Sequence, residues 1–524
     1  MDERISAAWT RLPDYLAQHV LLSACSLALG VLISLPLAIA ASRSPRLRWP
    51  VLAIASLIQT IPGLALLALF YPLLLAVSAL SQRTLGHGFS ALGFLPSLFA
   101  LTLYAMLPII RNTVTGLASV DPDVREAALG VGMTARQSLL KIELPLAASI
   151  IMAGLRTASV WVIGAATLST PVGQPSLGNY IFTGLQTENW VFVMFGCLAA
   201  AGLALVTDQL LGLIEGGLAR RKHRRVVVGL LGLAAGVAFA ISPLVSKPKA
   251  AYVIGAKTFS EQYILAQLIE DQLAENGMIA RQSVGLGSSV ILRALSENEI
   301  DAYVEYSGTI WANAMGRGDN PGREVILREV SDWLKAQRGV GVLGSLGFEN
   351  TYALAMRRDR ARALGVRTIE DLARQAFQLK MGGDYEFFAR PEWEAMRQSY
   401  GLEFKSRIEY QSTFMYRAVA QGEVDVISAF SSDGRIAGSN LVVLEDSRRA
   451  IPPYDALLLI APKRAEDAAF NAALRPLVGA ISIEAMRRAN ELVDQDSVPP
   501  QAAAHTLRKM IGLAGASPRR IAIP

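Results

Sequence analysis

The sequence predicts a two-part protein, with an α-helical membrane domain of about six spans followed by an α/β domain of two lobes. Three observations predict this division. The 524-residue chain is 52% hydrophobic and only 18% charged, whereas soluble domains carry about 25% charged residues. The apolar residues are concentrated before about residue 245. Beyond that point charges recur every few residues, and short apolar runs alternate with helical patterns, as in α/β domains.

The first part contains six runs long enough to cross a bilayer, which takes about 20 apolar residues. The second run is over-long and is interrupted at Pro62 and Gly63, so it is either one broken helix or two short segments. We therefore expect a membrane domain at 1–245, a linker at 246–250 and a soluble domain at 251–524. The expected spans are 19–41, 51–80, 91–110, 146–168, 190–214 and 226–245.

Basic residues indicate the orientation of these spans. Lysine and arginine gather at 43–48, 111–141 and 220–225, whereas the loops 81–90 and 169–189 hold only Arg83. Because cytoplasmic loops carry the excess of basic residues, we expect the three basic segments in the cytoplasm, and both termini and the soluble domain outside it. Basic residues also follow the first span, so it is not expected to be a cleavable signal peptide.

The cytoplasmic segment 119–145 carries its own helix signals. Asp121 can cap a short helix, which stops at a glycine turn containing Gly132. Thr134 and Gln137 have the spacing of a capping box for a second helix, which runs towards Pro145. Two helices that meet at a tight turn are either a simple connector or a docking surface for a cytoplasmic partner.

In this segment Glu126, Ala127 and Ala128 are followed by Gly132 and by the sequence IELP at 142–145. This pattern resembles the EAA loop of ATP-binding-cassette (ABC) importer permeases of the bacterial inner (cytoplasmic) membrane. In that family the loop is a coupling helix that enters a groove on the ATPase subunit. The chain has no phosphate-binding motif GxxxxGK[ST], so ATP would be used by a separate cytoplasmic ATPase. The resemblance also implies a second copy of the permease, because ATPases of this class work in pairs.

The soluble part contains an internal repeat. Residues 292–307 align without gaps to residues 416–431, with five of 16 positions identical. Each copy ends in a short apolar strand followed by an aromatic residue, Tyr306 or Phe430. Ligands of open α/β sheets bind beyond the carboxyl ends of the strands. We therefore expect Tyr306 and Phe430 at equivalent places in two lobes that face a cleft, unless each is only local core.

Two more aromatic residues, Tyr352 and Tyr454, begin apolar runs that resemble strand entries between the lobes. Together the four rings predict an aromatic cage, which binds quaternary ammonium groups by cation–π attraction. A trimethylammonium group has no N–H donors, so carboxylates gain little over ring faces. Arg390, in the sequence FFAR, could hold a carboxylate at the other end of the ligand. Taken singly, Tyr352 and Tyr454 are more typical of a core than of a ligand site, and Arg390 is more typical of a solvated surface.

The whole soluble part resembles the substrate-binding domains for glycine betaine, choline and related osmoprotectants. This resemblance implies a periplasmic-binding-protein-like clamshell of type II, with one lobe at about 251–345 plus 455–524 and the other at about 346–454. The motifs that carry it are KTFSEQ at 257–262, GSS at 287–289, VEYSGT at 304–309, GFENTY at 347–352, AFSSDGR at 429–435 and PPYD at 452–455.

The resemblance implies roles for eight residues. Tyr306, Tyr352, Phe430 and Tyr454 match the ammonium cage, and Arg390 matches the arginine that binds the carboxylate of betaines. The chain departs from the family at Phe430, where tyrosine is usual, and at RPEW in 390–393, which replaces the usual DGYPG. Polar positions at the pocket edge match Gln262, Thr309 and Asn350.

These observations predict the permease and fused binding domain of an ATP-driven importer of glycine betaine, choline, carnitine or proline betaine. One alternative is an amino-acid importer, whose site would use a carboxylate to receive ammonium N–H groups. Another is a membrane-anchored sensor, which would need a cytoplasmic output domain. The four histidines lack metal-ligand spacing and no nucleophile–base pair is visible, so we expect neither a metal site nor an enzyme. The small net charge of +6 does not indicate a nucleic-acid partner.

Overall fold

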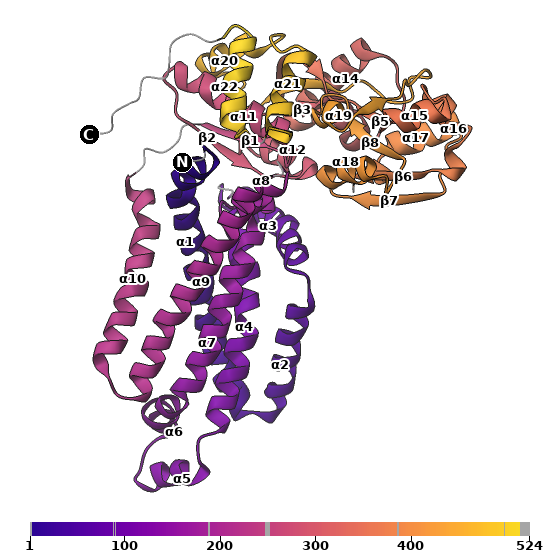
Figure 1. Ribbon diagram of the computed structural model, residues 1–524. Helices are drawn as coiled ribbons and strands as arrows, with labels where there is room; N and C mark the ends of the chain where they lie inside the picture. The colour runs from indigo at the N-terminus through magenta and orange to yellow at the C-terminus, as the bar shows by residue number, and fades with distance from the viewer. Residues whose placement is uncertain are drawn as a thin grey trace. The chain divides into compact units, whose positions relative to one another are not determined.

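In a computed structural model, the chain folds into two compact units (Figure 1). The first unit comprises Met1–Phe182 and Val191–Pro248, and the second comprises Thr183–Trp190 and Lys249–Pro524. The expected linker at 246–250 lies outside the described residues except for Ser246, which ends a helix. The structure describes residues 3–86, 89, 91–186, 189–246, 252–384, 387–496 and 498–513.

In the first unit, called the membrane unit below, all the regular secondary structure of the described residues is helical. Six segments there are long and apolar enough to cross a membrane, which confirms the expected number. The over-long second run is two helices, because Pro62 has no N–H to continue the first of them. The helices are α1 (Glu3–Arg43), α2 (Pro45–Thr60), α3 (Gly63–Leu85), α4 (Phe94–Ala118), α5 (Pro122–Gly130), α6 (Ala135–Ser138), α7 (Leu144–Ala166), α8 (Gly178–Gln186), α9 (Trp190–Ala219) and α10 (His223–Ser246).

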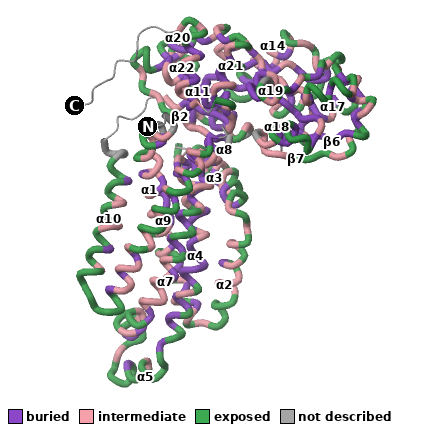
Figure 2. Tube along the Cα trace, in the orientation of Figure 1, coloured by how far each residue is buried: buried purple, intermediate pink, exposed green. Residues whose placement is uncertain are grey.

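Helix α4 forms the centre of this unit. It packs against α1 and α7 through a cluster of buried apolar side chains that includes Leu22, Leu101 and Val162. A Cβ atom at Gly154 of α7 would lie 2.6 Å from the Cβ of Asn112, so the two backbones approach closely where only glycine fits. Figure 2 shows the result, with α4 largely buried and α10 largely exposed.

The segment between α4 and α7 has the predicted capping. The Asp121 side chain accepts a hydrogen bond from the backbone of Asp123, and Thr134 and Gln137 form a complete capping box. After α6 the chain makes a π-helical turn, Leu139–Glu143, before α7 begins. Figure 1 shows α5 and α6 at the same end of the unit as the α1–α2 and α9–α10 turns, so the three basic segments share one end.

The second unit, called the binding unit below after the role expected from its sequence, contains two five-stranded sheets of the same topology. Their strand orders are β2-β1-β3-β10-β4 and β7-β6-β8-β5-β9. In each sheet the middle strand, β3 or β8, is parallel to one neighbour and antiparallel to the other. The strands are β1 (Tyr252–Ala256), β2 (Ala280–Val284), β3 (Ala302–Tyr306), β4 (Gly341–Glu349), β5 (Tyr352–Arg357), β6 (Lys380–Asp384), β7 (Ser406–Tyr410), β8 (Val426–Phe430), β9 (Leu441–Val443) and β10 (Asp455–Ile460).

The predicted repeat occupies equivalent places in these sheets. Residues 292–307 supply the end of α12 and strand β3, and residues 416–431 supply the end of α18 and strand β8. Both strands are third in their sheet. The chain passes from the first sheet to the second between Glu349 and Tyr352, and it returns between Val443 and Asp455.

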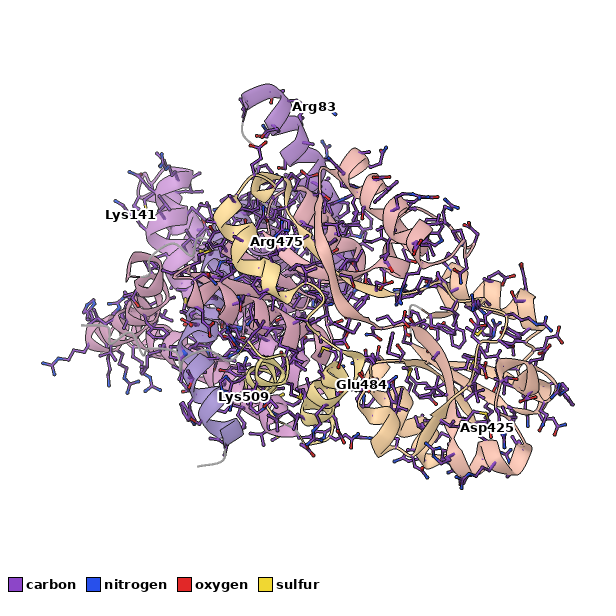
Figure 3. All side chains as sticks on the ribbon, turned by 90° about the horizontal axis from the view of Figure 1, so that it is seen from above. Arg83, Lys141, Asp425, Arg475, Glu484 and Lys509 are labelled. Atoms are coloured by element: carbon purple, nitrogen blue, oxygen red, sulfur yellow. The ribbon has the colours of Figure 1, made fainter. Side chains whose placement is uncertain are left out.

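Helices flank both sheets. The first helix, α11, is largely buried and packs against the C-terminal helices α21 and α22. Exposed charges in this C-terminal part include Arg475, Glu484 and Lys509 (Figure 3). The principal helices are α11 (Ser260–Glu275), α12 (Ser288–Ser296), α14 (Arg323–Arg338), α15 (Arg358–Leu364), α17 (Pro391–Tyr400), α18 (Ser412–Gln421), α20 (Ala468–Leu474), α21 (Ile483–Asp494) and α22 (Pro500–Met510).

Candidate functional site

A cavity of about 220 Å³ in the binding unit is lined by residues from both sheets. It brings together seven of the eight ligand-site residues expected from the sequence, and Gln262 is not among its lining residues. The lining consists of Lys257, Thr258, Phe259, Leu286, Gly287, Ser288, Tyr306, Thr309, Asn350, Tyr352, Asp384, Arg390, Gln411, Ser412, Phe430 and Tyr454.

Strand register places the four expected rings. Tyr306 ends β3 and Phe430 ends β8. In the second sheet Tyr352 pairs directly with Phe430, and in the first sheet Ala456, two residues after Tyr454, pairs with Tyr306. In each lobe, antiparallel pairing thus brings the aromatic residue at the end of one strand close to the aromatic residue at the start of its neighbour. The pairs are Tyr306 with Tyr454 and Phe430 with Tyr352.

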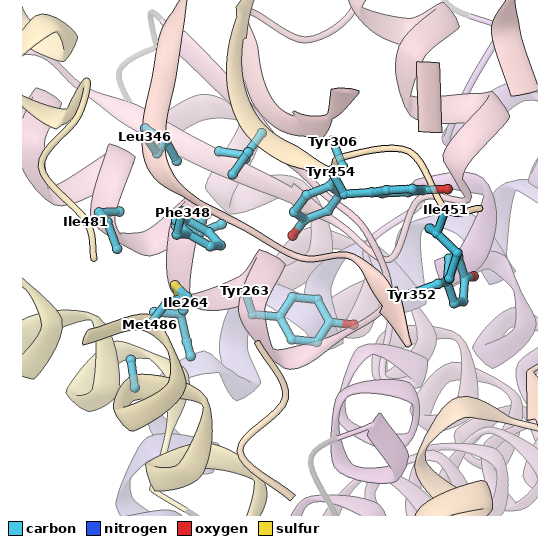
Figure 4. Packing of buried hydrophobic residues seen from close by; sticks show 14 of the residues in the cluster. Tyr263, Ile264, Tyr306, Leu346, Phe348, Tyr352, Ile451, Tyr454, Ile481 and Met486 are labelled. Atoms are coloured by element: carbon cyan, nitrogen blue, oxygen red, sulfur yellow. The ribbon is translucent and has the colours of Figure 1, made fainter. Parts of the chain in front are cut away.

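The rings lie within contact distance across the lobes. The Tyr352 ring centroid is 4.8 Å from that of Phe430 and 6.0 Å from that of Tyr454, which meets it edge-on at 89°. Figure 4 shows Tyr306, Tyr352 and Tyr454 in one buried cluster. A Cβ atom at Gly308 would come within 2.2 Å of the Tyr454 ring, so glycine is needed there for Tyr454 to occupy this place.

Phe259 is a fifth ring that we did not identify as a site residue from the sequence. It is parallel to Phe430 within 2° at a centroid distance of 6.5 Å, and it stacks on Tyr306 at 6.2 Å. The available signal was its place in the KTFSEQ motif. Its neighbour Gln262 lies behind the cavity, where its amide donates to the Val304 carbonyl at 2.9 Å and to the Tyr306 hydroxyl at 3.1 Å.

The Tyr306 hydroxyl donates to Glu261 at 2.5 Å, and this carboxylate is buried at the meeting point of the lobes. It also accepts hydrogen bonds from Asn350 at 3.1 Å, Ser432 at 2.5 Å and Asn490 at 2.8 Å. The pKa of the Glu261 carboxyl is raised above its ordinary value because the group is buried. The hydrogen bonds from the four donors act in the opposite direction and offset only part of this effect. Glu261 therefore fixes Tyr306 and joins both lobes.

Charged groups of both signs reach the cavity, whose lining includes Lys257, Arg390 and Asp384. The Arg390 guanidinium lies 5.1 Å from the centroid of the Tyr352 ring, and its Nη1 is 3.7 Å from a carboxylate oxygen of Glu392. The Tyr454 hydroxyl donates to the same oxygen. Lys257 is paired with buried Glu305. Ring faces can hold a quaternary ammonium group, and an arginine can hold a carboxylate, so the cavity suits a small zwitterion.

The AFSSDGR motif forms a seam between the lobes. The Gln495 side chain donates to the Gly434 carbonyl at 2.6 Å, and Arg487 donates to the Ser431 carbonyl at 2.9 Å. A Cβ atom at Gly434 would lie 2.4 Å from the backbone nitrogen of Glu491. The segment after β8 therefore rests directly on the backbone of α21.

In the membrane unit, the expected coupling residues lie on and after α5. Glu126 and Ala127 are exposed, whereas Ala128 is buried. Gly132 is exposed and has a φ of +84°, a conformation that favours glycine. Large apolar side chains nearby face outward, with exposed fractions of 37% for Val124, 57% for Leu129 and 76% for Val131.

A buried carboxylate supports this loop, and the sequence did not single it out. Glu143 forms ion pairs with Arg43 at 2.6 Å and Arg125 at 3.3 Å, and Ser138 donates to it at 3.2 Å. Arg125 belongs to α5 and Arg43 to the end of α1. Glu143, which lies in the IELP sequence, thus connects the segment 119–145, called the coupling segment below, to the helix bundle.

Comparison with known proteins assigns a family model to each unit. Residues 250–509 match "Substrate binding domain of ABC-type glycine betaine transport system", and residues 30–221 match "Binding-protein-dependent transport system inner membrane component". The chain is 28% identical over 426 residues to the ergothioneine transport permease/ergothioneine binding protein EgtU of Helicobacter pylori (strain G27), covering 78% of this chain and 74% of that protein.

Two further similarities concern one unit each. The chain is 37% identical over 198 residues to the choline transport system permease protein OpuBB of Bacillus subtilis (strain 168), covering 38% of this chain and 84% of that protein. A crystal structure of a glycine betaine/carnitine/choline ABC transporter aligns with 26% identity and a TM-score of 0.45, covering 49% of this chain and 98% of that one.

The raised pKa of Glu261 predicts a pH dependence of stability. A carboxyl whose pKa is higher in the folded state favours folding when protonated, and this contribution is lost as the pH rises through the folded pKa. We expect the free energy of unfolding of the wild-type binding unit, relative to Glu261→Gln, to fall as the pH rises above about 4.3. Urea unfolding at a series of pH values measures this difference. A difference that is constant or rises with pH would contradict the assignment.

Proposed function

This chain belongs to the glycine betaine/choline/carnitine family of ABC importers, as a permease fused to its substrate-binding domain, and we propose that its cargo is a small quaternary ammonium solute. Glycine betaine, choline, carnitine and proline betaine are the first candidates. The observation that supports this proposal most strongly is one cavity that gathers the four rings and Arg390.

In the proposed complex, Tyr306, Tyr352, Phe430 and Tyr454 present ring faces to the ammonium group. Phe259 extends this surface, because it is parallel to Phe430 and stacks on Tyr306. The hydroxyls of Tyr306 and Tyr454 already donate to Glu261 and Glu392, so they orient the rings rather than serve the ligand. The lack of a hydroxyl at Phe430 is compatible with this mechanism, since a ring face is sufficient.

The remaining contacts in the proposal are polar. Arg390 receives the carboxylate of a betaine, and Thr309 and Asn350 line the edge of the cavity. Gln262 acts indirectly by holding the Tyr306 hydroxyl and the end of β3. The ligand closes the unit by binding the first lobe, which we assign to about 251–345 plus 455–524, against the second at about 346–454.

A second candidate cargo is ergothioneine. The Helicobacter pylori protein named for this solute aligns with both units of the chain, and ergothioneine is itself a trimethylammonium betaine with a thione-substituted imidazole ring. The cavity lining includes Asp384 and Gln411 in addition to Arg390 and the rings. A carboxylate and an amide can accept hydrogen bonds from ring N–H groups, which glycine betaine and choline lack.

We further propose that the coupling segment docks on a cytoplasmic ABC ATPase, which hydrolyses ATP, and that two copies of this chain form the permease. The outward-facing Val124, Leu129 and Val131 beside Glu126 provide apolar area for such a contact, and buried Glu143 gives the segment a fixed base. The binding unit would lie outside the cytoplasm of a bacterial cell, attached to the inner membrane by the spans.

The cage proposal predicts selective losses of ligand affinity. Tyr306→Ala or Tyr454→Ala should weaken binding by roughly 1–2 kcal/mol, about tenfold per 1.4 kcal/mol, while phenylalanine at either position should cost much less. Phe430→Tyr should be nearly neutral. Arg390→Ala should weaken the binding of betaines but not of choline, which has no carboxylate. Calorimetry of the binding unit against glycine betaine, choline, carnitine, proline betaine and ergothioneine measures these effects.

Two variants serve as matched controls for this panel. Tyr252→Phe removes the hydroxyl of a half-buried tyrosine that donates to Asp467 and does not line the cavity, and Tyr410→Ala removes a ring outside the lining. Equal damage by phenylalanine and alanine at Tyr306 and Tyr454 would show that the hydroxyls are the real contacts. If none of the four ring positions affected binding, the cage proposal would be wrong.

The coupling proposal predicts transport failure without loss of binding. Glu126→Lys reverses an exposed charge on the proposed docking face of α5, and a bulky residue at Gly132 cannot adopt its positive φ without strain. Both changes should abolish uptake and substrate-stimulated ATP hydrolysis, while the binding unit keeps its affinity. Glu324→Lys, a charge reversal in the first turn of α14, is the control and should transport normally. Normal transport by both loop variants would reject the docking role.

The orientation proposal predicts one-sided thiol labelling. In a chain with Cys25→Ser and Cys197→Ser, Ser246→Cys should react with a membrane-impermeant reagent in intact cells, and His223→Cys should react only after the cells are opened. The basis is the excess of arginine and lysine at 220–225. The opposite labelling pattern would place the binding unit in the cytoplasm.

A further inference from the structure

The membrane unit contains an ion cluster that no step described above uses. Arg156 lies near the middle of the 23-residue helix α7. Its Nε and Nη2 each donate to one oxygen of Asp208 at 2.8 Å, and its Nη1 donates to Glu215 at 2.8 Å. Both carboxylates belong to α9. The three side chains are 33%, 22% and 24% exposed, so the cluster reaches the surface of the single chain.

Such a cluster is costly at a lipid-facing surface. Ionisable side chains within membrane helices are rare, and where they occur they face the interior of an assembly or a water-filled route. Two carboxylates and one guanidinium also leave a net charge of −1. The pairing of Arg156 with both acids removes the cost of an isolated cation, but it leaves one negative charge without a cation in the cluster.

The exposed residues of α7 differ from those of the peripheral helices. Around the cluster, α7 exposes Thr157, Val160, Trp161 and Gly164. The exposed residues of α3 from Leu64 to Leu80, and those of α10 from Val227 to Phe239, are all apolar. Apolar faces are typical of lipid contact, whereas this part of α7 combines a charge, a hydroxyl, a glycine and a tryptophan.

A hollow of about 420 Å³ lies on this face. It is lined by Ala153, Arg156, Thr157, Val160, Trp161 and Asp208. Asp208, a member of this net-negative cluster, and the indole side chain of Trp161 therefore occur together beside an open space. This is the chemistry that attracts a quaternary ammonium group, through the charge and through cation–π contact with tryptophan, the best of the ring faces.

We propose that this hollow is a transit site for the quaternary ammonium group of the cargo on its route through the membrane unit. The inference rests on the proposed function, since it takes the same cargo. Asp208 and Trp161 contact the ammonium group, and Arg156 is a positioning residue that holds both carboxylates in place. The face of α7 that carries the hollow borders a water-filled route and not lipid.

Thiol labelling of the full chain in membrane vesicles tests the water-filled route. In the background lacking native cysteines, Thr157→Cys should react with a water-soluble thiol reagent, and choline or glycine betaine should slow the reaction. Leu231→Cys on the exposed face of α10 is the control and should react poorly with or without these solutes. If Thr157→Cys is unreactive, or if neither solute slows its reaction, the face is covered by lipid or protein and the proposal fails.

Uptake measurements test the contacts. Asp208→Asn and Trp161→Leu should reduce uptake of labelled choline and glycine betaine, with a raised KM, while Trp161→Phe should retain most of it. Because the binding unit is unaltered, its affinity for both solutes should be that of the wild type. Uptake unchanged in Trp161→Leu, or lost equally in Trp161→Phe, would overturn the transit site. Failure of the wild-type binding unit to bind any of the five solutes in the calorimetry panel would instead reject the proposed function.

Discussion

The binding unit depends on the hydrogen-bonding requirement of one buried carboxylate. A carboxylate removed from water is tolerated only when donors replace the lost solvation, and Glu261 receives them from four separate parts of the unit. Tyr306 comes from the end of β3, Asn350 from the crossing between the sheets, Ser432 from the segment after β8 and Asn490 from α21. Any rearrangement that separates these elements leaves acceptor positions unfilled, which typically costs about 1–3 kcal/mol for each buried group.

In the membrane unit another buried carboxylate, that of Glu143, likewise connects separate elements of the structure. Glu143 lies where the coupling segment joins α7, and its two arginine partners come from α1 and α5. This arrangement lets a short exposed loop act as a rigid extension of the bundle, because force on α5 is transmitted through ion pairs as well as through the backbone. The π-helical turn Leu139–Glu143 brings the Glu143 side chain to this junction.

Local signals in the sequence predicted most of the fold, because spans, caps and breaks are set by residues close in the chain. The break at Pro62, the caps at Asp121 and Thr134, and the equivalence of β3 and β8 are of this kind. The four rings were identified because two repeated strand ends and two strand starts have a recognisable pattern. Glu261, Glu143 and the orientation of Gln262 depend on partners that are distant in sequence, and Phe259 sits in a loop without periodicity. No local pattern reveals such contacts.

The absence of a side chain at Gly434 has a consequence for affinity that involves no ligand contact. The backbone of this residue rests on that of Glu491, with no room for a Cβ atom. A larger side chain at residue 434 would push the segment after β8 away from α21. It would raise the free energy of the arrangement in which the two lobes are in contact, relative to arrangements in which they are apart. The apparent dissociation constant equals the intrinsic one divided by the fraction of molecules competent to bind. A single methyl group at residue 434, which does not line the cavity, would therefore make every solute bind more weakly by the same factor. A larger residue at position 434 is therefore expected to lower the affinity for all solutes without changing selectivity among them.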